Sequence, residues 1–165
     1  MDFTKQERFC VTVYKNQDFI EVETFSGHGI TTSDPDGIQK LLPLDISDEE
    51  LGQVTLLALA KSRILDVNEL GPLINRDNVK KRYDTWVTDL MAKYNYKTKR
   101  ALFKKMMQCS VEISDGILTI SPSCHEKLEG WGDKGLTKDD DVVLSVNSTT
   151  EEIGAGVRLA FSRCR

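Results

Sequence analysis

The chain has 165 residues, of which 39% are hydrophobic, and it carries a formal net charge of −4 with a pI of about 5.3. This length can bury a core in one globular domain, residues 1–165, and the acidic balance argues against a dedicated nucleic-acid-binding protein. No signal-peptide segment opens the sequence and no run approaches about 18 apolar residues, so we expect a cytoplasmic protein without contact with the membrane.

Two strands are predicted at the start of the chain. Residues 9–15 and 19–25 are rich in β-branched and aromatic residues, and Asn16-Gln17-Asp18 between them is typical of a turn. Ile20 and Val22 share one face of the second strand, and we expect that face to pack inward. The opposite face carries Phe19, Glu21, Glu23 and Phe25.

A loop is predicted at Ser26–Thr32, where two glycines flank His28. Glycine beside serine and histidine is compatible with a phosphate cradle or a hydrolytic site, but the segment lacks the Gly-Lys-Ser/Thr end of a Walker loop. A Ser–His pair also needs an orienting acid, which a sequence does not reveal. We expect the glycines to allow a tight exit from the strand, and keep a hydrolase using Ser26 or His28 as an alternative.

The next predicted elements are a turn and a long helix. Asp34-Pro35-Asp36-Gly37 is typical of a turn. Ser47-Asp48-Glu49-Glu50 is a capping box, which predicts a helix from Asp48 to about Arg63. This helix is apolar around much of its circumference, so we expect it to be central and buried. Residues 66–76 are expected to be a connection with one helical turn near 68–70, because Gly71-Pro72 interrupts it.

Two helices and a hairpin are predicted between residues 83 and 122. Apolar residues recur at helical spacing over 83–94, and a second helix is expected over Thr98–Met107 with Thr98 as its cap. Asp115-Gly116 then separates two alternating runs, which predicts a type I′ hairpin. In this register the residues of one buried face are Val111, Ile113, Leu118 and Ile120.

The end of the chain is predicted to be a loop, a strand and a helix. Residues 123–138 are expected to form a long loop that contains His125 and Trp131, followed by a strand over 142–146. Overlapping capping boxes at 148–152 begin the last helix. The order β-β-α-α-α-β-β-β-α indicates an α+β fold, with an antiparallel or mixed sheet of about five strands and about four helices.

Neither a metal nor a cofactor is expected. Cys124-His125-Glu126 is consecutive, so its side chains diverge on any regular backbone and do not converge on an ion. The four cysteines lack the C-x-x-C spacing of zinc or redox sites, and we expect free thiols, with Cys109 and Cys164 on buried faces. The cysteines are Cys10, Cys109, Cys124 and Cys164.

A basic segment, residues 93–105, provides the second alternative function. Six cations with Tyr94 and Tyr96 among them have the composition of a site that follows a phosphate backbone and stacks bases. If Leu102 and Phe103 face inward, however, the cations occupy the solvated face of an amphipathic helix. We favour the solvated face and keep a nucleic-acid-binding module as the alternative.

Several segments resemble a known family. The run Tyr94–Phe103, followed by Ile120-Ser121-Pro122, resembles immunity proteins that protect bacteria against the toxins of contact-dependent growth inhibition. Ser26–Thr32, Ser47–Gly52 and Glu152–Ala155 match the same pattern in order, so the resemblance covers nearly the whole chain.

The resemblance implies a protein that is not an enzyme and that binds the C-terminal domain of its cognate toxin in a 1:1 complex. Such toxins are commonly nucleases, often acting on tRNA, and an acidic inhibitor surface would mimic the nucleic acid and occlude the active site without binding nucleic acid itself. The carboxylate-rich windows are therefore the candidate toxin-binding residues, with those beside residues 123–138 preferred because Trp131 can serve as an aromatic anchor. The candidates are Asp139, Asp140, Asp141, Trp131, His125, Asp34, Asp36, Asp48 and Glu49.

Overall fold

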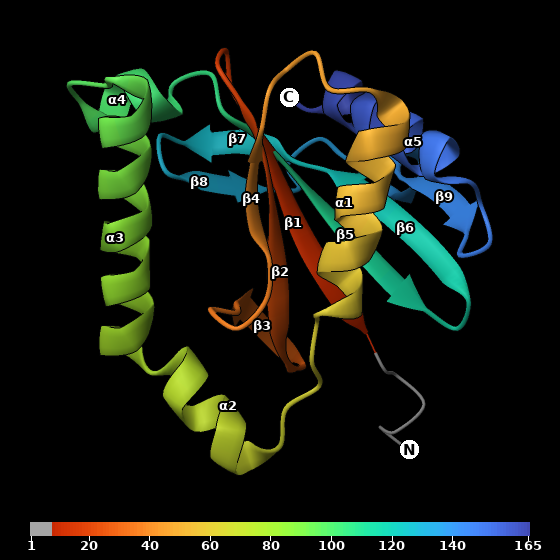
Figure 1. Ribbon diagram of the computed structural model, residues 1–165, viewed down its shortest axis with the longest axis horizontal. Coiled ribbons are helices and arrows are strands. Elements are labelled where there is room, and N and C mark those ends of the chain that lie inside the picture. The colour runs from red at the N-terminus through yellow and green to blue at the C-terminus, as the bar shows by residue number, and fades with distance from the viewer. Residues whose placement is uncertain (1–7) are drawn as a thin grey trace.

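A seven-stranded antiparallel sheet is the centre of the computed structural model, which describes residues 8–165 (Figure 1). Its strand order is β3-β2-β1-β5-β6-β9, with β4 also paired to β2, and a separate hairpin is formed by β7 and β8. The strands are β1 (Phe9–Lys15), β2 (Ile20–His28), β3 (Ile30–Ser33), β4 (Gln39–Leu42), β5 (Met107–Ser114), β6 (Ile117–Pro122), β7 (Cys124–Lys127), β8 (Gly130–Gly132) and β9 (Val142–Ser145).

Helices cover both faces of the sheet. The helices are α1 (Asp48–Ala60), α2 (Val67–Ile74), α3 (Arg76–Tyr94), α4 (Lys99–Phe103) and α5 (Thr150–Arg163), with a short 3₁₀ turn, η2 (Lys138–Asp140). Helices α1 and α5 pack together on one face, and α3 and α4 lie on the side of β2 away from α1 (Figure 1). None of the helices in the described part of the chain is long and apolar enough to cross a membrane.

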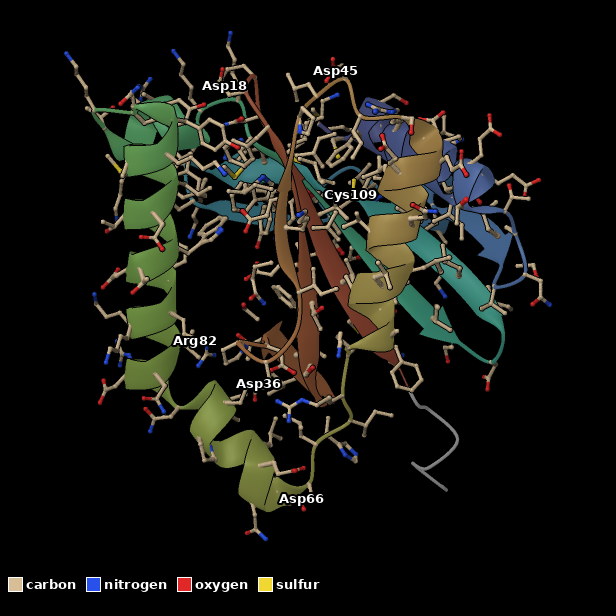
Figure 2. All side chains as sticks on the ribbon, in the orientation of Figure 1. Asp18, Asp36, Asp45, Asp66, Arg82 and Cys109 are labelled. Carbon is tan, nitrogen blue, oxygen red and sulfur yellow. The ribbon has the colours of Figure 1, made fainter. Side chains whose placement is uncertain are left out.

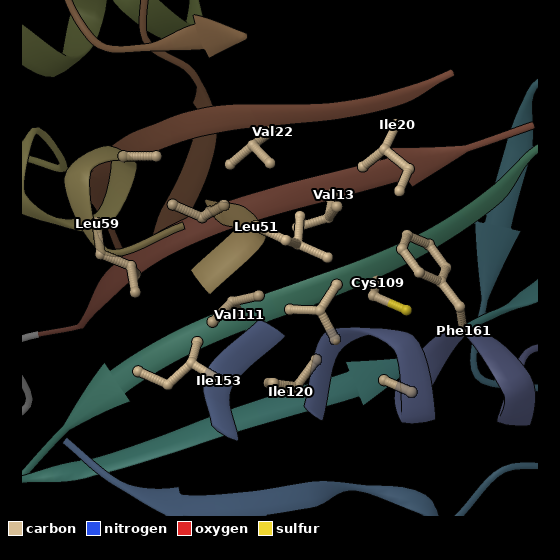
Figure 3. Packing of buried hydrophobic residues seen from close by; sticks show 14 of the residues in the cluster. Val13, Ile20, Val22, Leu51, Leu59, Cys109, Val111, Ile120, Ile153 and Phe161 are labelled. Carbon is tan, nitrogen blue, oxygen red and sulfur yellow. The ribbon is translucent and has the colours of Figure 1, made fainter. Parts of the chain in front are cut away.

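The main hydrophobic core lies between the sheet and helices α1 and α5 (Figure 3). The antiparallel register places Val13 between Val22 on β2 and Cys109 on β5, so that these three side chains form one row on the same face. Leu51 and Ile153 cover the sheet from the two helices and are 0% exposed. The prediction that the Ile20/Val22 face packs inward is therefore confirmed, since both residues belong to this core.

Two glycines allow α1 and α5 to come into close contact. A Cβ added to Gly52 would lie 1.7 Å from the Thr150 carbonyl oxygen, and one added to Gly154 would lie 1.8 Å from the Asp48 carbonyl oxygen. Arg158 of α5 also donates from Nε to Asp48 Oδ1 at 2.8 Å. The segments Ser47–Gly52 and Glu152–Ala155, which carry part of the family resemblance, are thus explained by the packing of two helices.

A second core lies on the other face of the sheet, under α3 and α4. It consists of Tyr14, Phe19, Val87, Leu90, Leu102, Phe103 and Met106, with Trp86 and Trp131 packed against it. Phe19, which directly precedes β2, stacks on Tyr94 with ring centroids 4.7 Å apart. Strand β2 is therefore buried on both faces along much of its length.

The α+β prediction and the central hairpin are confirmed. Asp115 and Gly116 have φ values of 51° and 77°, and Ser114 pairs with Ile117 as a two-residue type I′ turn requires. The capping box that begins α5 is also present, between Thr149 and Glu152.

The strand predictions were incomplete at three places. The predicted loop Ser26–Thr32 is a hairpin instead: β2 continues to His28, Gly29 turns with a φ of 75°, and β3 begins at Ile30. Strand β4 was missed because Gln39-Lys40-Leu41-Leu42 shows no alternation. The predicted loop 123–138 contains the β7–β8 hairpin and ends where η2 begins.

The helix predictions were wrong mainly at the boundaries. Residues 66–76 contain the eight-residue α2, whose Asp66/Glu69 capping box stabilises it despite Pro72. Helix α3 begins at Arg76 rather than near residue 83, because Asn75 caps it. The predicted helix Thr98–Met107 ends at Phe103, and Met107 already belongs to β5.

Helix α1 also differs from its prediction as a central, fully buried helix. It ends at Ala60, and Leu57 on its outer side is 59% exposed. The helix therefore covers one face of the sheet with a buried stripe, Val54 and Leu56 are partly buried against the same core, and Leu57 lies at the surface.

Candidate functional site

Asp34 lies inside the protein, which removes it from any acidic surface. It is 0% exposed and accepts hydrogen bonds from Arg63 Nε at 2.8 Å and from Ser26 Oγ at 2.6 Å. Burial alone would raise the pKa of Asp34, but these hydrogen bonds lower it below its ordinary value. Asp36 lies at the exposed side of the same arginine, with Oδ2 3.4 Å from Arg63 Nη2. Of this acidic pair, only Asp36 faces solvent.

The Ser26 hydroxyl group is used by this network. Ser26 is 1% exposed, and besides donating to Asp34 it accepts from the Arg63 backbone N–H at 2.9 Å. The serine joins the β2 strand to the chain that follows α1, and its oxygen is enclosed. These contacts give Ser26 a structural role. They argue against the alternative in which its hydroxyl group is the nucleophile of a hydrolase.

Trp131 and His125 are brought together, but in an aromatic cluster. Their rings stack with centroids 5.0 Å apart, and Trp131 Nε1 donates to the Met106 carbonyl oxygen at 3.0 Å. Trp131 also lies edge-on to Tyr14, at 6.0 Å between centroids. The indole is therefore half-buried and hydrogen-bonded inside the protein, which is a poor arrangement for an anchor that must enter a partner.

The other predicted acidic residues differ in how accessible their charges are. Asp140 accepts from the Thr137 backbone N–H at 2.8 Å as part of the η2 capping box, and Asp139 is exposed. Arg163 donates to the Asp140 and Asp141 carbonyl oxygens, which places a positive charge beside this window. In the α1 window, Asp48 is paired with Arg158, as described above, and Glu49 is exposed.

The basic segment 93–105 has the predicted amphipathic arrangement. Leu102, Phe103 and Met106 are 0% exposed, whereas the cations around them face solvent. The two tyrosines are used internally: Tyr94 stacks on Phe19, and the Tyr96 hydroxyl group donates to Asp18. Because the Tyr94 ring is stacked inside the protein and the Tyr96 hydroxyl group is held by Asp18, the solvated-face interpretation is favoured over a nucleic-acid-binding module.

A groove that the sequence did not predict lies between helix α3 and strands β2 and β4. Its volume is about 680 Å³, and Figure 2 shows Arg82 of α3 on the side of the helix that faces the sheet. Its floor contains Glu21 and Glu23, which are only 3% and 6% exposed. Its rim carries charged residues of both signs, which are Lys40, Lys81, Asp89 and Lys93.

The two glutamates of the groove are held in an unfavourable environment. Trp86 Nε1 donates to Glu21 Oε2 at 2.8 Å, and the Ser33 hydroxyl group donates to Glu23 Oε1. Burial, together with the nearby charge of Glu23, raises the pKa of Glu21 from 4.5 to about 7, and burial also raises the pKa of Glu23. Burying two neighbouring carboxyl groups destabilises the folded protein. Buried carboxyl groups with raised pKa values are typical of functional sites.

The guanidinium group of Arg82, which also lines the groove, is incompletely hydrogen-bonded. Its Nη2 donates to the Leu73 carbonyl oxygen at 2.7 Å, but its buried Nε has no hydrogen-bond partner within the described residues. Arg82 also lines a smaller adjoining chamber of about 130 Å³ with Tyr14, Tyr83 and Trp86. The groove is therefore lined by aromatic and charged side chains, with two nearly buried carboxyl groups at its floor and an incompletely hydrogen-bonded arginine in its wall.

The alternation on β2 contained a signal for this groove. The face with Glu21 and Glu23 begins with Phe19 and ends with Phe25, and a strand face bounded by two phenylalanines is unlike a solvated edge.

No group of three or more His, Cys, Asp or Glu residues able to hold a metal ion occurs within residues 8–165.

The chain is similar to known immunity proteins over almost all of its length. The family model described as CDI immunity protein, CdiI, matches residues 10–164. The immunity protein CdiI-YPIII of Yersinia pseudotuberculosis serotype O:3 (strain YPIII) is 45% identical over 166 residues, covering 93% of this chain and 94% of that protein.

Two solved structures have the same fold. One is a chain of a CdiA-CT/CdiI toxin and immunity complex from Yersinia pseudotuberculosis, with a TM-score of 0.89, 42% identity, and coverage of 96% of this chain and 98% of that chain. The other is a protein of unknown function from Neisseria meningitidis, with a TM-score of 0.91, 39% identity and complete coverage of both chains.

Proposed function

Because this chain belongs to the CdiI family of CDI immunity proteins, we propose that it binds and neutralises the C-terminal toxin domain of a cognate CdiA protein. The observation that carries this proposal is the similarity to a CdiA-CT/CdiI complex at 42% identity over 96% of the chain. The chain acts by binding alone, without a cofactor and without catalysing a reaction.

The proposed mechanism is occlusion of a nuclease active site in the cytoplasm, in a 1:1 complex. A nuclease must hold phosphate groups, so its active site is basic, and a net charge of −4 on the inhibitor favours rapid association with it. A tRNA-cleaving toxin is the preferred target class. Binding over the active site then excludes the nucleic acid without any chemical step.

We propose the groove between α3 and β2/β4 as the toxin-binding surface. A partner segment in the groove can supply cationic groups to the carboxylates of Glu21 and Glu23, which compensates for their burial. Trp86 is half-buried at the wall, and tryptophan is enriched among the residues that dominate binding energies. The folding cost of these polar groups is then recovered when the toxin binds.

The window Asp139–Asp141 is the competing surface. It offers exposed charge at η2, and Asp36 and Glu49 offer further charge elsewhere on the protein. Such residues steer a basic partner and act mainly on the association rate at low salt. They do not supply the concave, partly apolar contact that the groove has.

Two substitutions on helix α3 test whether the toxin binds in the groove. Thr85 lines the groove, whereas Thr88 is exposed on the same helix outside it and bonds back to the Asp84 carbonyl oxygen. We expect Thr85→Arg to weaken toxin binding by about 100-fold or more, because the long side chain fills the groove, and Thr88→Arg to leave binding nearly unchanged.

The measurements are the association rate and the dissociation constant for the cognate toxin domain, with circular dichroism to verify folding. A variant with Asn at positions 139, 140 and 141 is measured in parallel and should lower only the association rate. If this triple variant abolishes toxin binding while Thr85→Arg binds normally, the η2 window is the binding surface and the assignment to the groove is wrong.

A further inference from the structure

Two cysteines that are distant in the sequence bring their sulfur atoms close together. Cys109 on β5 and Cys164 at the end of α5 are 55 positions apart, and their Sγ atoms are separated by 3.6 Å. Cys109 belongs to the main core, near Phe161 in Figure 3. Cys164 Sγ also lies 3.5 Å from the Gln108 carbonyl oxygen and 3.6 Å from that of Ala160.

The two thiols have different roles in this contact. Cys109 is 0% exposed, whereas Cys164 is half-buried and accessible from the surface. The contact with Cys109 is the main cause that lowers the pKa of Cys164 below its ordinary value, and the same contact, with burial, raises the pKa of Cys109. Cys164 is thus the less buried cysteine and the one whose thiol ionises more readily, and Cys109 is the enclosed partner.

We propose that Cys109 and Cys164 form an oxidant-sensitive dithiol that hydrogen peroxide or another hydroperoxide converts into a disulfide. The geometry that carries this proposal is the direct contact of a half-buried cysteine with an enclosed one, with 3.6 Å between the two sulfur atoms. An S–S bond of roughly 2.05 Å requires these sulfur atoms to move closer together. Neither thiol has a part in the groove between α3 and β2/β4.

The oxidation takes place in two balanced steps. The Cys164 thiolate attacks one peroxide oxygen, the O–O bond breaks, and hydroxide leaves and takes up a proton as water, which gives a sulfenic acid on Cys164. The Cys109 sulfur then attacks the Cys164 sulfur, the S–O bond breaks, and a second water leaves with the Cys109 proton. Two thiols lose two electrons in total, and one peroxide is reduced to two water molecules.

The disulfide would fasten the C-terminal end of the chain to the sheet. The residue after Cys164 is already paired there: the Arg165 backbone N–H donates to Ser123 O at 3.1 Å, and its carbonyl oxygen accepts from His125 N–H at 2.7 Å. The new bond closes a loop of 55 positions between β5 and the end of α5. From the entropy of closing such a loop, the melting temperature should rise by about 8–16 °C.

The test treats the purified full-length protein with hydrogen peroxide and maps its cysteines by mass spectrometry under non-reducing conditions. We expect a loss of mass equal to two hydrogens, a peptide in which Cys109 is linked to Cys164, and a higher melting temperature that dithiothreitol reverses. Cys124→Ser is the matched control, because Cys124 is also half-buried and its removal should change none of these results.

Two further variants keep the proposal falsifiable if one of them folds poorly. Cys109→Ser should leave a sulfenic acid on Cys164 that dimedone traps, whereas Cys164→Ser should protect Cys109 from oxidation altogether. Linkage of Cys164 to Cys124, or oxidation of Cys124 while Cys109 and Cys164 stay reduced, would overturn the proposal. An intermolecular disulfide as the main product would overturn it as well.

Discussion

Replacing Glu21 with glutamine should stabilise the protein above about pH 7 and have little effect below about pH 4.5. The carboxyl group is buried on β2 beside Glu23, and its pKa is raised from 4.5 to about 7, first by burial and then by the charge of Glu23. The folded protein therefore holds this proton more tightly than the unfolded chain does. The cost of burying Glu21 is absent below about pH 4.5, grows as the pH rises, and is complete above about pH 7.

The size of the effect follows from the same values. A rise from 4.5 to about 7 corresponds to about 3 kcal/mol of unfolding free energy, at about 1.4 kcal/mol for each tenfold change in proton affinity. Glutamine removes the ionisation but keeps an oxygen that can accept from Trp86 Nε1. The variant should therefore gain up to about 3 kcal/mol at about pH 8.

Urea denaturation at about pH 5 and about pH 8 measures this difference. Asp89→Asn is the matched control, because Asp89 is an exposed carboxylate at the rim of the same groove and its loss changes the net charge equally. If the unfolding free energies of wild type and Glu21→Gln run parallel across this pH range, or if the variant is less stable at about pH 8, Glu21 is not a buried, destabilised carboxyl group.

Three further substitutions test the packing. Gly52→Ala should destabilise the protein by about 1–3 kcal/mol, because the new Cβ collides with the Thr150 carbonyl oxygen and forces α1 from α5, and an unchanged melting curve would contradict the close contact. Gly116→Val should lower stability or solubility, since a β-branched residue resists a φ of 77°, and normal thermal melting would contradict the type I′ turn. Trp86→Ala should cost about 3 kcal/mol in chemical denaturation by removing a packed aromatic ring, and a cost below about 1 kcal/mol would show that α3 is not docked by this side chain.

The sequence was most informative where local chemistry determines the structure. The turn at Asp115-Gly116 was predicted because these residue types tolerate positive φ values. The starts of α1 and α5 were predicted because the Ser47 and Thr149 side chains cap a backbone N–H only three residues ahead. The Asp66/Glu69 capping box of α2 was also present in the sequence but was overlooked, and Gly71-Pro72 was taken as the end of a single helical turn. A proline destabilises a short helix, but tertiary contacts can offset this cost. A local sequence pattern does not reveal such contacts.

The groove was not predicted because its parts come from distant segments. Glu21 meets Trp86 across 65 positions of sequence, and nothing local to either residue indicates the other. The prediction of Asp34 as a surface residue was wrong for the same reason. Its charge suggested exposure, but the fold places Arg63 against its carboxylate. Charge in a sequence locates a titratable group, but only the tertiary structure determines whether that group faces solvent, a partner side chain or a cavity.

The central claim, that the chain neutralises a toxin by binding it, is tested most directly by calorimetric titration of the purified protein into the C-terminal domain of its cognate CdiA. We expect one molecule to bind one toxin domain with nanomolar affinity or tighter, equivalent to about −12 kcal/mol. An absence of binding, or a dissociation constant in the micromolar range or weaker for a folded toxin domain, would contradict the claim.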